Sequence, residues 1–262
     1  MASCWPRTSP RFAPNVANPI ILCGGAGTRL RTVIGEEPKS LACIGRRPFL
    51  EILLRQLRRH GFERVILAVG YQKDLVRLHF GDHALGLKIS YSVELTPLGT
   101  GGALRNAVAL IESDIALIMN GDSYTDVDLG AFWTNFQQES ADVSLVVVPA
   151  EDRDDCGSVA VAPDGRVLGF REKQLVVGKT YVNAGIYLAG KRILGEIPED
   201  IQVSLETEMF PRWLKEGKSL GAFLHFGECV DIGTPDRFKS AQIILANAEL
   251  DEHPAGREGK RA

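Results

Sequence analysis

The fold is decided by the stretch Ile20-Ile21-Leu22-Cys23-Gly24-Gly25-Ala26-Gly27-Thr28-Arg29-Leu30. Its apolar beginning predicts a buried strand, and its three glycines predict a tight loop at the carboxyl end of that strand. Glycine lets a ligand approach the backbone because it has no Cβ. Successive N–H groups turned into such a loop form an anion site, and Arg29 adds a planar cation suited to phosphate. The stretch therefore predicts a nucleotide-phosphate loop.

Residue spacing excludes two common loops of this kind. A P-loop needs a glycine, four residues and then Gly-Lys-Ser/Thr, but the count from Gly24 reaches Arg29. A dinucleotide fingerprint that starts at Gly25 needs a third glycine at the position of Leu30. For this stretch alone, a turn that is merely rich in glycine remains an alternative.

The composition is that of a soluble globular protein, with 45% hydrophobic and 24% charged residues among 262. The net charge of −3 provides no positive field for nucleic acid or an anionic membrane, and no apolar run is long enough to span a bilayer. We therefore expect neither partner. The five cysteines are odd in number and widely spaced, which favours a reducing, cytoplasmic setting over a disulfide framework or a zinc site.

Strand and helix patterns alternate through the first half of the chain. The expected strands are residues 20–23, 64–69, 88–93 and 115–119, and the expected helices are residues 49–60, 75–80 and 102–112. This alternation predicts a Rossmann-like α/β fold with a doubly wound, mixed but mostly parallel sheet. Ligands of such sheets gather at the carboxyl ends of the strands. The glycine loop and Asn120-Gly121-Asp122 both fall there.

The second half has a more antiparallel pattern. We expect strands at residues 143–148, 158–162, 167–171, 181–188 and 220–226, a helix at residues 205–217 interrupted at Pro211, and a closing helix at residues 235–250. Residues 20–250 are expected to form one domain, with a nucleotide-binding half at 20–140 and an acceptor half at 141–250. Residues 1–19, with four prolines, are expected to be a disordered tail, and residues 251–262 a frayed one.

An ordered set of motifs resembles the sugar-1-phosphate nucleotidyltransferases, or NDP-sugar pyrophosphorylases. It consists of the glycine loop, Pro38-Lys39, Leu98-Gly99-Thr100-Gly101-Gly102, Asn120-Gly121-Asp122, Glu172-Lys173 and Asp231-Ile232-Gly233. The resemblance covers residues 20–245 and implies a GT-A-like nucleotidyltransferase fold. It also implies that an oxygen of a sugar 1-phosphate attacks the α-phosphorus of a nucleoside triphosphate, with Mg²⁺ as cofactor, and that pyrophosphate leaves.

The resemblance also assigns roles to individual residues. Arg29, Lys39, Asp122 and Lys173 are the expected catalytic residues, and Asp122 and Asp231 are the expected ligands of Mg²⁺. The expected nucleotide-binding residues are Leu22, Gly24, Gly25, Gly27, Thr28, Arg29, Gly99, Thr100 and Gly121. The expected sugar-phosphate-binding residues are Gly101, Glu172, Lys173 and Asn183, with Lys173 pairing with the phosphate.

Several alternatives stay open at this point. The run Asn120-Gly121-Asp122-Ser123-Tyr124 most resembles family members that transfer a guanylyl group from GTP to a heptose 1-phosphate. Transfer to mannose 1-phosphate, or of a uridylyl or thymidylyl group, is the alternative. A catalytically silent nucleotide-sugar sensor would lack Lys39, Asp122 or Asp231, and all three are present. Assembly into a homo-oligomer is left open.

Overall fold

The computed structural model describes residues 16–149, 158–171 and 181–247 of the chain. The predicted disordered tail up to residue 15, the predicted frayed end from residue 248, and Glu172 and Lys173 lie outside the described residues. In the described part, none of the helices is both long and apolar enough to cross a membrane.

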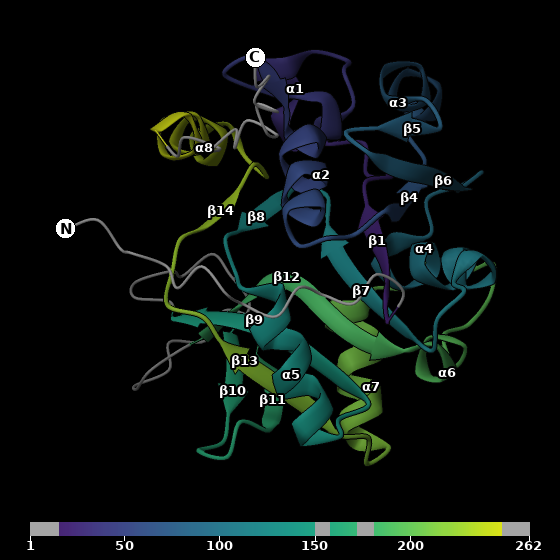
Figure 1. Cartoon of the computed structure of the whole chain (residues 1–262), viewed down its shortest axis with the longest axis vertical. Coiled ribbons are helices and arrows are strands. Elements are labelled where there is room, and N and C mark those ends of the chain that lie inside the picture. The colour runs from purple at the N-terminus through teal and green to yellow at the C-terminus, as the bar shows by residue number, and fades with distance from the viewer. Residues whose placement is uncertain (1–15, 150–157, 172–180, 248–262) are drawn as a thin grey trace, which may run out of the picture.

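A mixed sheet of ten strands forms the centre of the molecule (Figure 1). Its order is β11-β10-β12-β7-β1-β4-β6-β5, with β9 pairing with β12 and β13 pairing with β9. In the first half, the strands β1 (Asn18–Leu22), β4 (Arg64–Val69), β6 (Leu87–Val93) and β7 (Ile115–Asn120) are parallel, and in the second half β13 runs parallel to β9. The other strands are β5 (His83–Ala84), β9 (Val143–Pro149), β10 (Ser158–Val161), β11 (Val167–Arg171), β12 (Tyr181–Gly190) and β13 (Leu220–Leu224). The predicted α/β fold with a mostly parallel first half is confirmed.

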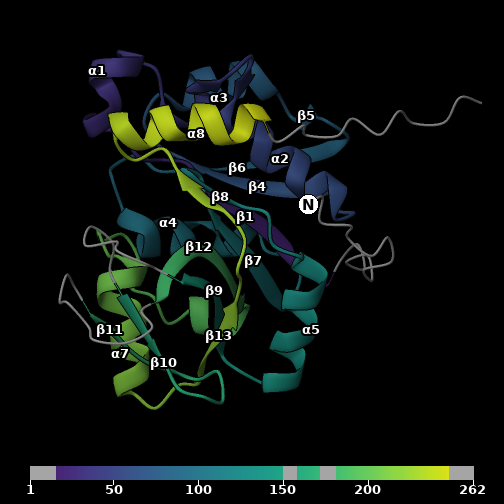
Figure 2. The same cartoon turned by 90° about the vertical axis from the view of Figure 1, so that its left-hand side faces the viewer.

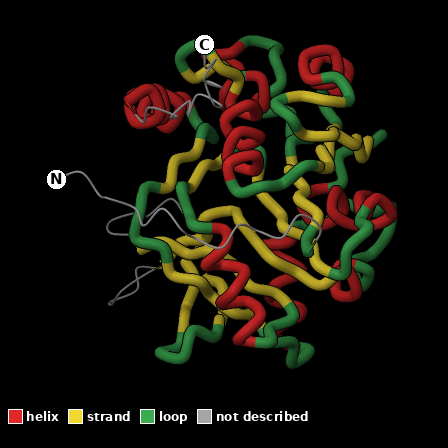
Figure 3. Tube along the Cα trace, in the orientation of Figure 1, coloured by secondary structure: helices red, strands yellow, loops and turns green. Residues whose placement is uncertain are grey.

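Helices cover both faces of this sheet, as Figure 3 shows with helices in red and strands in yellow. One apolar cluster contains Ile21 of β1 and side chains of α2 (Phe49–Arg59), α3 (Lys73–Phe80), α5 (Leu129–Glu139) and α8 (Pro235–Asn247). The other contains Ile20 and side chains of α4 (Gly99–Ala107), α6 (Lys191–Leu194) and α7 (Phe210–Lys215). Successive residues of β1 therefore face opposite cores, which explains its continuous apolar run.

Strands from both sides of the boundary predicted at residue 140 belong to this one sheet. Strand β12 runs antiparallel to β7, so that Ile186 lies opposite Met119. In Figure 1 the teal strand β7 of the first half lies beside the green strand β12 of the second half. The nucleotide-binding and acceptor halves share one sheet, and their division stays a prediction about function.

Two short strands that no sequence pattern indicated bring distant residues together. Strand β8 (Ser123–Thr125) pairs antiparallel with β14 (Cys229–Asp231), which places Asp231 opposite Ser123. The chain then turns into α8, which packs back against the first half of the molecule (Figure 2). There the Gln242 side chain bonds the backbone of Cys43 in β2 (Cys43–Ile44) and of Gly45, just before β3 (Arg47–Pro48).

Several predicted boundaries were wrong. The first strand begins at Asn18, inside the predicted tail, because the buried Asn18 side chain accepts hydrogen bonds from the backbone of Glu112 and Ser113. The helix expected at residues 102–112 begins at Gly99, since the Glu94 carboxylate and the Val203 carbonyl accept from the backbone of its first turn. It ends at Ala107 and gives way to a 3-10 turn.

Predicted elements in the second half also differ from those in the structure. Pro211 does not interrupt the helix at residues 205–217, because a π-helix (Leu205–Met209) leads into α7 and Pro211 lies in the first turn of α7. The missing N–H of proline costs nothing in a first turn. Strand β13 ends at Leu224 rather than at residue 226, and Asp231 belongs to the separate short strand β14. Helix α8 is described as far as Asn247.

Candidate active site

A cavity of about 590 Å³ opens at the carboxyl ends of β1, β4, β6 and β7. Six segments contribute to it: the glycine loop, the turn at Lys39, the connections that follow β4, β6 and β7, and the segment at Gln202. It is lined by Leu22, Cys23, Gly24, Gly25, Ala26, Lys39, Ser40, Gly70, Tyr71, Lys73, Glu94, Leu95, Thr96, Pro97, Gly99, Thr100, Ala103, Asn120, Gly121, Asp122 and Gln202. The fold thus forms its cavity where a doubly wound sheet binds ligands.

Gly24 and Gly121 let the connections after β1, β6 and β7 approach one another closely. A Cβ on Gly24 would lie 2.4 Å from the Glu94 Oε1 atom, and a Cβ on Gly121 would lie 2.5 Å from the Leu22 carbonyl oxygen. Gly25, in contrast, has no atom within 4 Å of its Cβ position and is exposed. Gly121, which meets the Leu22 backbone, is therefore needed for packing, Gly24 leaves room for the Glu94 carboxylate, and Gly25 presents open backbone to the cavity.

Cys23 at the end of β1 does not provide a reactive thiol. It is buried, and this burial together with the nearby Glu94 charge raises the pKa of its thiol to about 12. The side chain stays protonated at neutral pH and fills space at the end of the strand.

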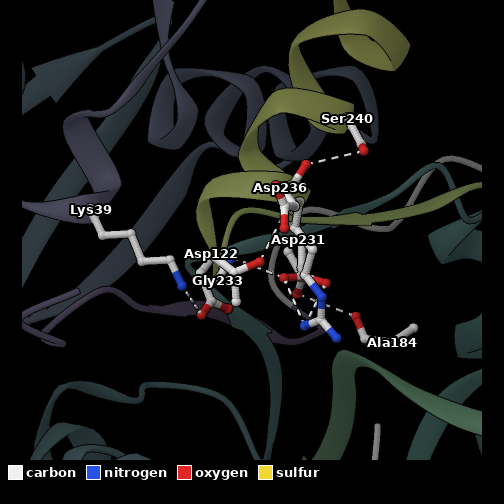
Figure 4. Close-up of polar contacts among 10 residues, drawn as sticks. Lys39, Asp122, Ala184, Asp231, Gly233, Asp236 and Ser240 are labelled. Atoms are coloured by element: carbon white, nitrogen blue, oxygen red, sulfur yellow. Dashed lines mark hydrogen bonds and ion pairs between the residues drawn. The ribbon is translucent and has the colours of Figure 1, made fainter. Parts of the chain in front are cut away.

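Lys39 is held against Asp122 inside the cavity. Its Nζ atom donates to the Asp122 Oδ2 atom at 2.6 Å (Figure 4). The lysine side chain is only 13% exposed, and its stem packs against Gly27, where a Cβ would lie 2.9 Å from the Lys39 Cβ atom. A cation and an anion of the cavity thus come from segments 83 residues apart.

Asp231 lies next to this pair, as Figure 4 shows. The Ile232 backbone N–H donates to the Asp122 carbonyl at 2.9 Å, which holds the two segments together. A Cβ on Gly233 would lie 3.0 Å from the Asp231 Oδ1 atom and 3.7 Å from the Lys39 Nζ atom. The glycine leaves open a space that faces both charged groups. Among the described residues, no cluster of three or more His, Cys, Asp or Glu side chains is placed to hold a metal ion.

A partly buried polar network connects the first turn of α4 with β12. Glu206 accepts hydrogen bonds from the hydroxyls of Thr100 at 2.6 Å and Tyr187 at 3.1 Å. The Tyr187 hydroxyl in turn accepts from the Asn183 amide at 2.8 Å. Desolvation of the fully buried ring raises the pKa of Tyr187 well above its usual value, so its hydroxyl stays protonated. The network fixes the relative position of the expected nucleotide-binding and sugar-binding segments.

The structure separates the predicted site residues into three groups. Leu22, Gly24, Gly25, Lys39, Gly99, Thr100, Gly121 and Asp122 line the cavity. Gly27, Thr28, Arg29, Gly101, Asn183 and Asp231 do not, and the side chains of Thr28 and Arg29 are exposed. The N–H of Gly101 is already bonded to the Val203 carbonyl at 2.9 Å. Glu172 and Lys173 lie outside the described residues.

Glu94 is the main cavity residue that the sequence did not indicate. It follows β6 as a single carboxylate with no motif of its own, and its Oε2 atom accepts from the Leu98 N–H at 3.0 Å. Burial raises its pKa, and the hydrogen bond from Leu98 partly opposes this shift. Lys73 and Tyr71 were also missed, and the Tyr71 hydroxyl donates to the Glu36 carboxylate at 2.8 Å.

Gly185 in β12 packs against Ser123 and Asn120, next to the cavity. Its φ is 75°, and a Cβ there would lie 2.6 Å from the Ser123 hydroxyl and 2.9 Å from the Asn120 amide. We expect Gly185→Ala to lower the free energy of unfolding by about 2–4 kcal/mol, through left-handed backbone strain and overpacking. Urea unfolding followed by circular dichroism measures this.

The matched control is Gly169→Ala in β11, where no atom lies within 4 Å of the Cβ position. That variant should stay within about 0.5 kcal/mol of the natural protein. A Gly185→Ala variant as stable as Gly169→Ala would show that β12 can shift to accept the side chain.

Comparison with known proteins agrees with this geometry. The profile of the nucleotidyl transferase family matches residues 18–247. A D-glycero-alpha-D-manno-heptose 1-phosphate guanylyltransferase from Aneurinibacillus thermoaerophilus is 34% identical over 226 residues, which cover 86% of this chain and 97% of that protein. A mannose-1-phosphate guanylyltransferase from Mycobacterium tuberculosis is 34% identical over 229 residues, which cover 87% of this chain and 64% of that protein.

Solved structures show the same relationship. The crystal structure of HddC from Yersinia pseudotuberculosis complexed with GMP-PN has a TM-score of 0.77 and 31% identity, covering 87% of this chain and 99% of that one. The chain therefore belongs to the nucleotidyl transferase family. It is an enzyme of the nucleotidyltransferase class, and the fold and family expected from its motifs are confirmed.

Proposed function

We propose that this enzyme transfers a guanylyl group from GTP to D-glycero-α-D-manno-heptose 1-phosphate and releases pyrophosphate. The observation that carries the proposal is that one cavity contains both the Lys39–Asp122 pair and a half-buried carboxylate, Glu94. The Lys39–Asp122 pair suits the reacting phosphates, and the Glu94 carboxylate suits a guanine base. The names and substrates of the relatives described above support the same choice.

Glu94 favours guanine over the other bases on chemical grounds. Guanine presents the N1–H and the 2-amino group side by side, and a carboxylate with two acceptor oxygens pairs with both. Uracil and thymine present one N–H between two carbonyls, which a carboxylate repels. The Glu94 carboxylate lies beside Gly24, in a part of the cavity that also includes Leu95 and Pro97. A base between these residues would exclude water from the hydrogen bonds.

The reacting groups would lie near Lys39. In the proposed step, a phosphate oxygen of the sugar 1-phosphate attacks the α-phosphorus, and the bond from that phosphorus to the bridging oxygen breaks. Two anions must approach each other, so a fixed cation lowers the barrier. Lys39 supplies this charge, and the open backbone of Gly25 offers N–H groups to the phosphates. A phosphate monoester is already ionised at neutral pH, so no general base is required.

Asp122 and Asp231 fit the role of ligands for Mg²⁺. The two carboxylates come from segments that the backbone hydrogen bond from Ile232 to Asp122 holds side by side, and Mg²⁺ prefers one or two carboxylates with phosphate oxygens and water completing its shell. Such an ion, when bound, neutralises charge on the phosphate oxygens. Arg29, exposed in this structure, would reach the β- and γ-phosphates only by turning toward the cavity.

The sugar side of the proposal rests on Asn120, Asn183 and the residues at 172–173. Asn120 lines the cavity, and its Oδ1 atom is buried without a hydrogen-bond partner among the described residues. A buried acceptor without a partner is costly, so we assign it to a substrate hydroxyl. Glu172 and Lys173 remain the proposed contacts to a sugar hydroxyl and to the sugar phosphate. Mannose 1-phosphate is the alternative acceptor. A cytoplasmic setting and a homo-oligomer also stay predictions.

Glu94→Gln tests the choice of base. It keeps an acceptor for the Leu98 N–H but turns an amide toward guanine, so we expect kcat/KM for GTP to fall about 30-fold. The ratio of kcat/KM for GTP to that for UTP should fall with it. Glu63→Gln, at an exposed position, is the control and should leave both values unchanged. An unaltered GTP-to-UTP ratio in Glu94→Gln would remove Glu94 from base recognition.

The same variant gives a pH test. Because burial raises the pKa of Glu94, its carboxylate is protonated at a higher pH than that of an exposed glutamate. Guanine needs the ionised form, so kcat/KM for GTP should decline as the pH falls through this raised pKa. The Glu94→Gln variant has no carboxylate to protonate and should lack that part of the decline.

A further inference from the structure

Both proposed metal ligands already carry a cation as partner. The Asp122 Oδ2 atom pairs with the Lys39 Nζ atom at 2.6 Å, and the Asp231 Oδ2 atom pairs with the Arg237 Nη1 atom at 3.1 Å. The same Arg237 nitrogen lies 3.1 Å from the other carboxylate oxygen of Asp231. One guanidinium nitrogen thus contacts both oxygens that would bind a metal ion.

The arrangement around Asp231 holds this pair in a defined position. The Gly233 backbone N–H donates to the Asp231 Oδ1 atom at 2.9 Å, and Arg237 lies in the first turns of α8 directly after this turn. The Asp231 and Arg237 side chains are 21% and 26% exposed, so bulk water screens the pair only in part. The Arg237 Nη1 atom is 3.9 Å from the Cβ position of Gly233, in the space that faces Lys39.

Because of these contacts, Arg237 and a divalent cation would compete for the Asp231 carboxylate. A divalent cation that approached Asp231 without nucleotide would have to displace Arg237 or share the carboxylate with it, and two neighbouring positive charges repel each other. A triphosphate in the cavity would offer Lys39 and Arg237 another anionic partner. The carboxylates would then be released for the metal ion at the moment when the phosphate oxygens that complete its shell arrive.

We propose that Arg237 is a positioning residue that occupies Asp231 as its counter-ion and thereby prevents a divalent cation from binding before the nucleotide does. The proposal rests on the proposed function, in which Asp231 is a metal ligand. Metal and nucleotide then bind with positive linkage: each raises the affinity of the other, by the same factor in both directions. In sequence Arg237 is an ordinary surface-type residue of a helix, and only the turn at Gly233 brings it to the site.

The test is a Mn²⁺ titration of the full chain without nucleotide, with free Mn²⁺ followed by electron paramagnetic resonance. Arg237→Gln should bind Mn²⁺ at least about fivefold more tightly than the natural protein, because the competing cation is gone. Arg237→Lys keeps the charge and should stay close to the natural affinity. Arg212→Gln, which removes an exposed pair with Glu216, is the matched control and should change nothing.

A second titration in the presence of a non-hydrolysable GTP analogue measures the linkage. The gain in Mn²⁺ affinity that the analogue produces should be several-fold smaller in Arg237→Gln than in the natural protein. Thermal unfolding checks that the variants fold, and Arg237→Met replaces Arg237→Gln if the latter does not. Unchanged or weaker Mn²⁺ binding by a folded, neutral variant would overturn the proposal.

The outcome also separates this inference from the proposed function. Asp231→Asn should weaken Mn²⁺ binding if Asp231 is a metal ligand. If Asp231→Asn has no effect, the ligand assignment in the proposed function fails, and the inference fails with it. If Asp231→Asn weakens binding while Arg237→Gln does not strengthen it, only the inference about Arg237 fails.

Discussion

Replacement of Lys39 by methionine is expected to lower kcat by about 10²- to 10³-fold, the usual cost of removing one preorganised charge-stabilising group. Methionine keeps a long apolar stem, and the Lys39 stem packs against Gly27, so the loop should retain its shape. The lost group is the ammonium that lies 2.6 Å from Asp122 in the cavity. If this charge acts mainly in the transition state, KM for both substrates should change much less than kcat.

Steady-state measurement of pyrophosphate release gives both constants. Lys88→Met, at an exposed position of β6, is the matched control and should behave like the natural enzyme. A kcat for Lys39→Met within tenfold of the natural value would show that Lys39 does not stabilise the reacting phosphates. A large rise in KM with unchanged kcat would show that it contributes only to binding.

Asp122→Asn is expected to reduce turnover by more than about 10³-fold. Asparagine has the same shape and leaves the backbone bond between Asp122 and Ile232 intact, so the β8–β14 contact should persist. It removes a negative charge, however, which both a divalent cation and Lys39 require. The loss should appear in kcat/KM at every Mg²⁺ concentration that the assay can reach.

Asp126→Asn provides the control for this variant. Asp126 lies on the same connection but pairs with Arg59 at the surface, and its side chain is 52% exposed. This substitution should leave activity within about twofold, since exposed ion pairs contribute little. Near-normal activity of Asp122→Asn would contradict the assignment of Asp122 as a metal ligand and leave Asp231 to be tested alone.

The first half of the fold was predictable because its signals are local. Strand β1 and the glycine loop are one continuous pattern, and strands buried on both faces read as apolar runs. Helix α5 was missed because its sequence contains few strong helix formers. It is stabilised by its Asp128 cap and by the packing of Phe132 against Phe223, and the latter partner is distant in sequence.

The site was predictable only where motifs define it. Lys39 and Asp122 follow motif residues, and the structure brings them together. Glu94 and Arg237 have no motif, and their positions depend on Gly24 and on the turn at Gly233. Strand β14, which carries Asp231, was missed because a strand of three residues has no period that a pattern could reveal.

The most direct test of the proposed reaction is pyrophosphate release by the full chain with Mg²⁺. GTP, UTP, dTTP, CTP and ATP are each combined with D-glycero-α-D-manno-heptose, mannose and glucose 1-phosphates, and the sugar nucleotide is identified by mass spectrometry. We predict release with GTP and the heptose 1-phosphate, with GDP-heptose as product. Release with another nucleotide but not with GTP would contradict the role of Glu94. If no combination releases pyrophosphate while GTP still binds, the result would contradict the proposed reaction and favour a nucleotide-sugar sensor.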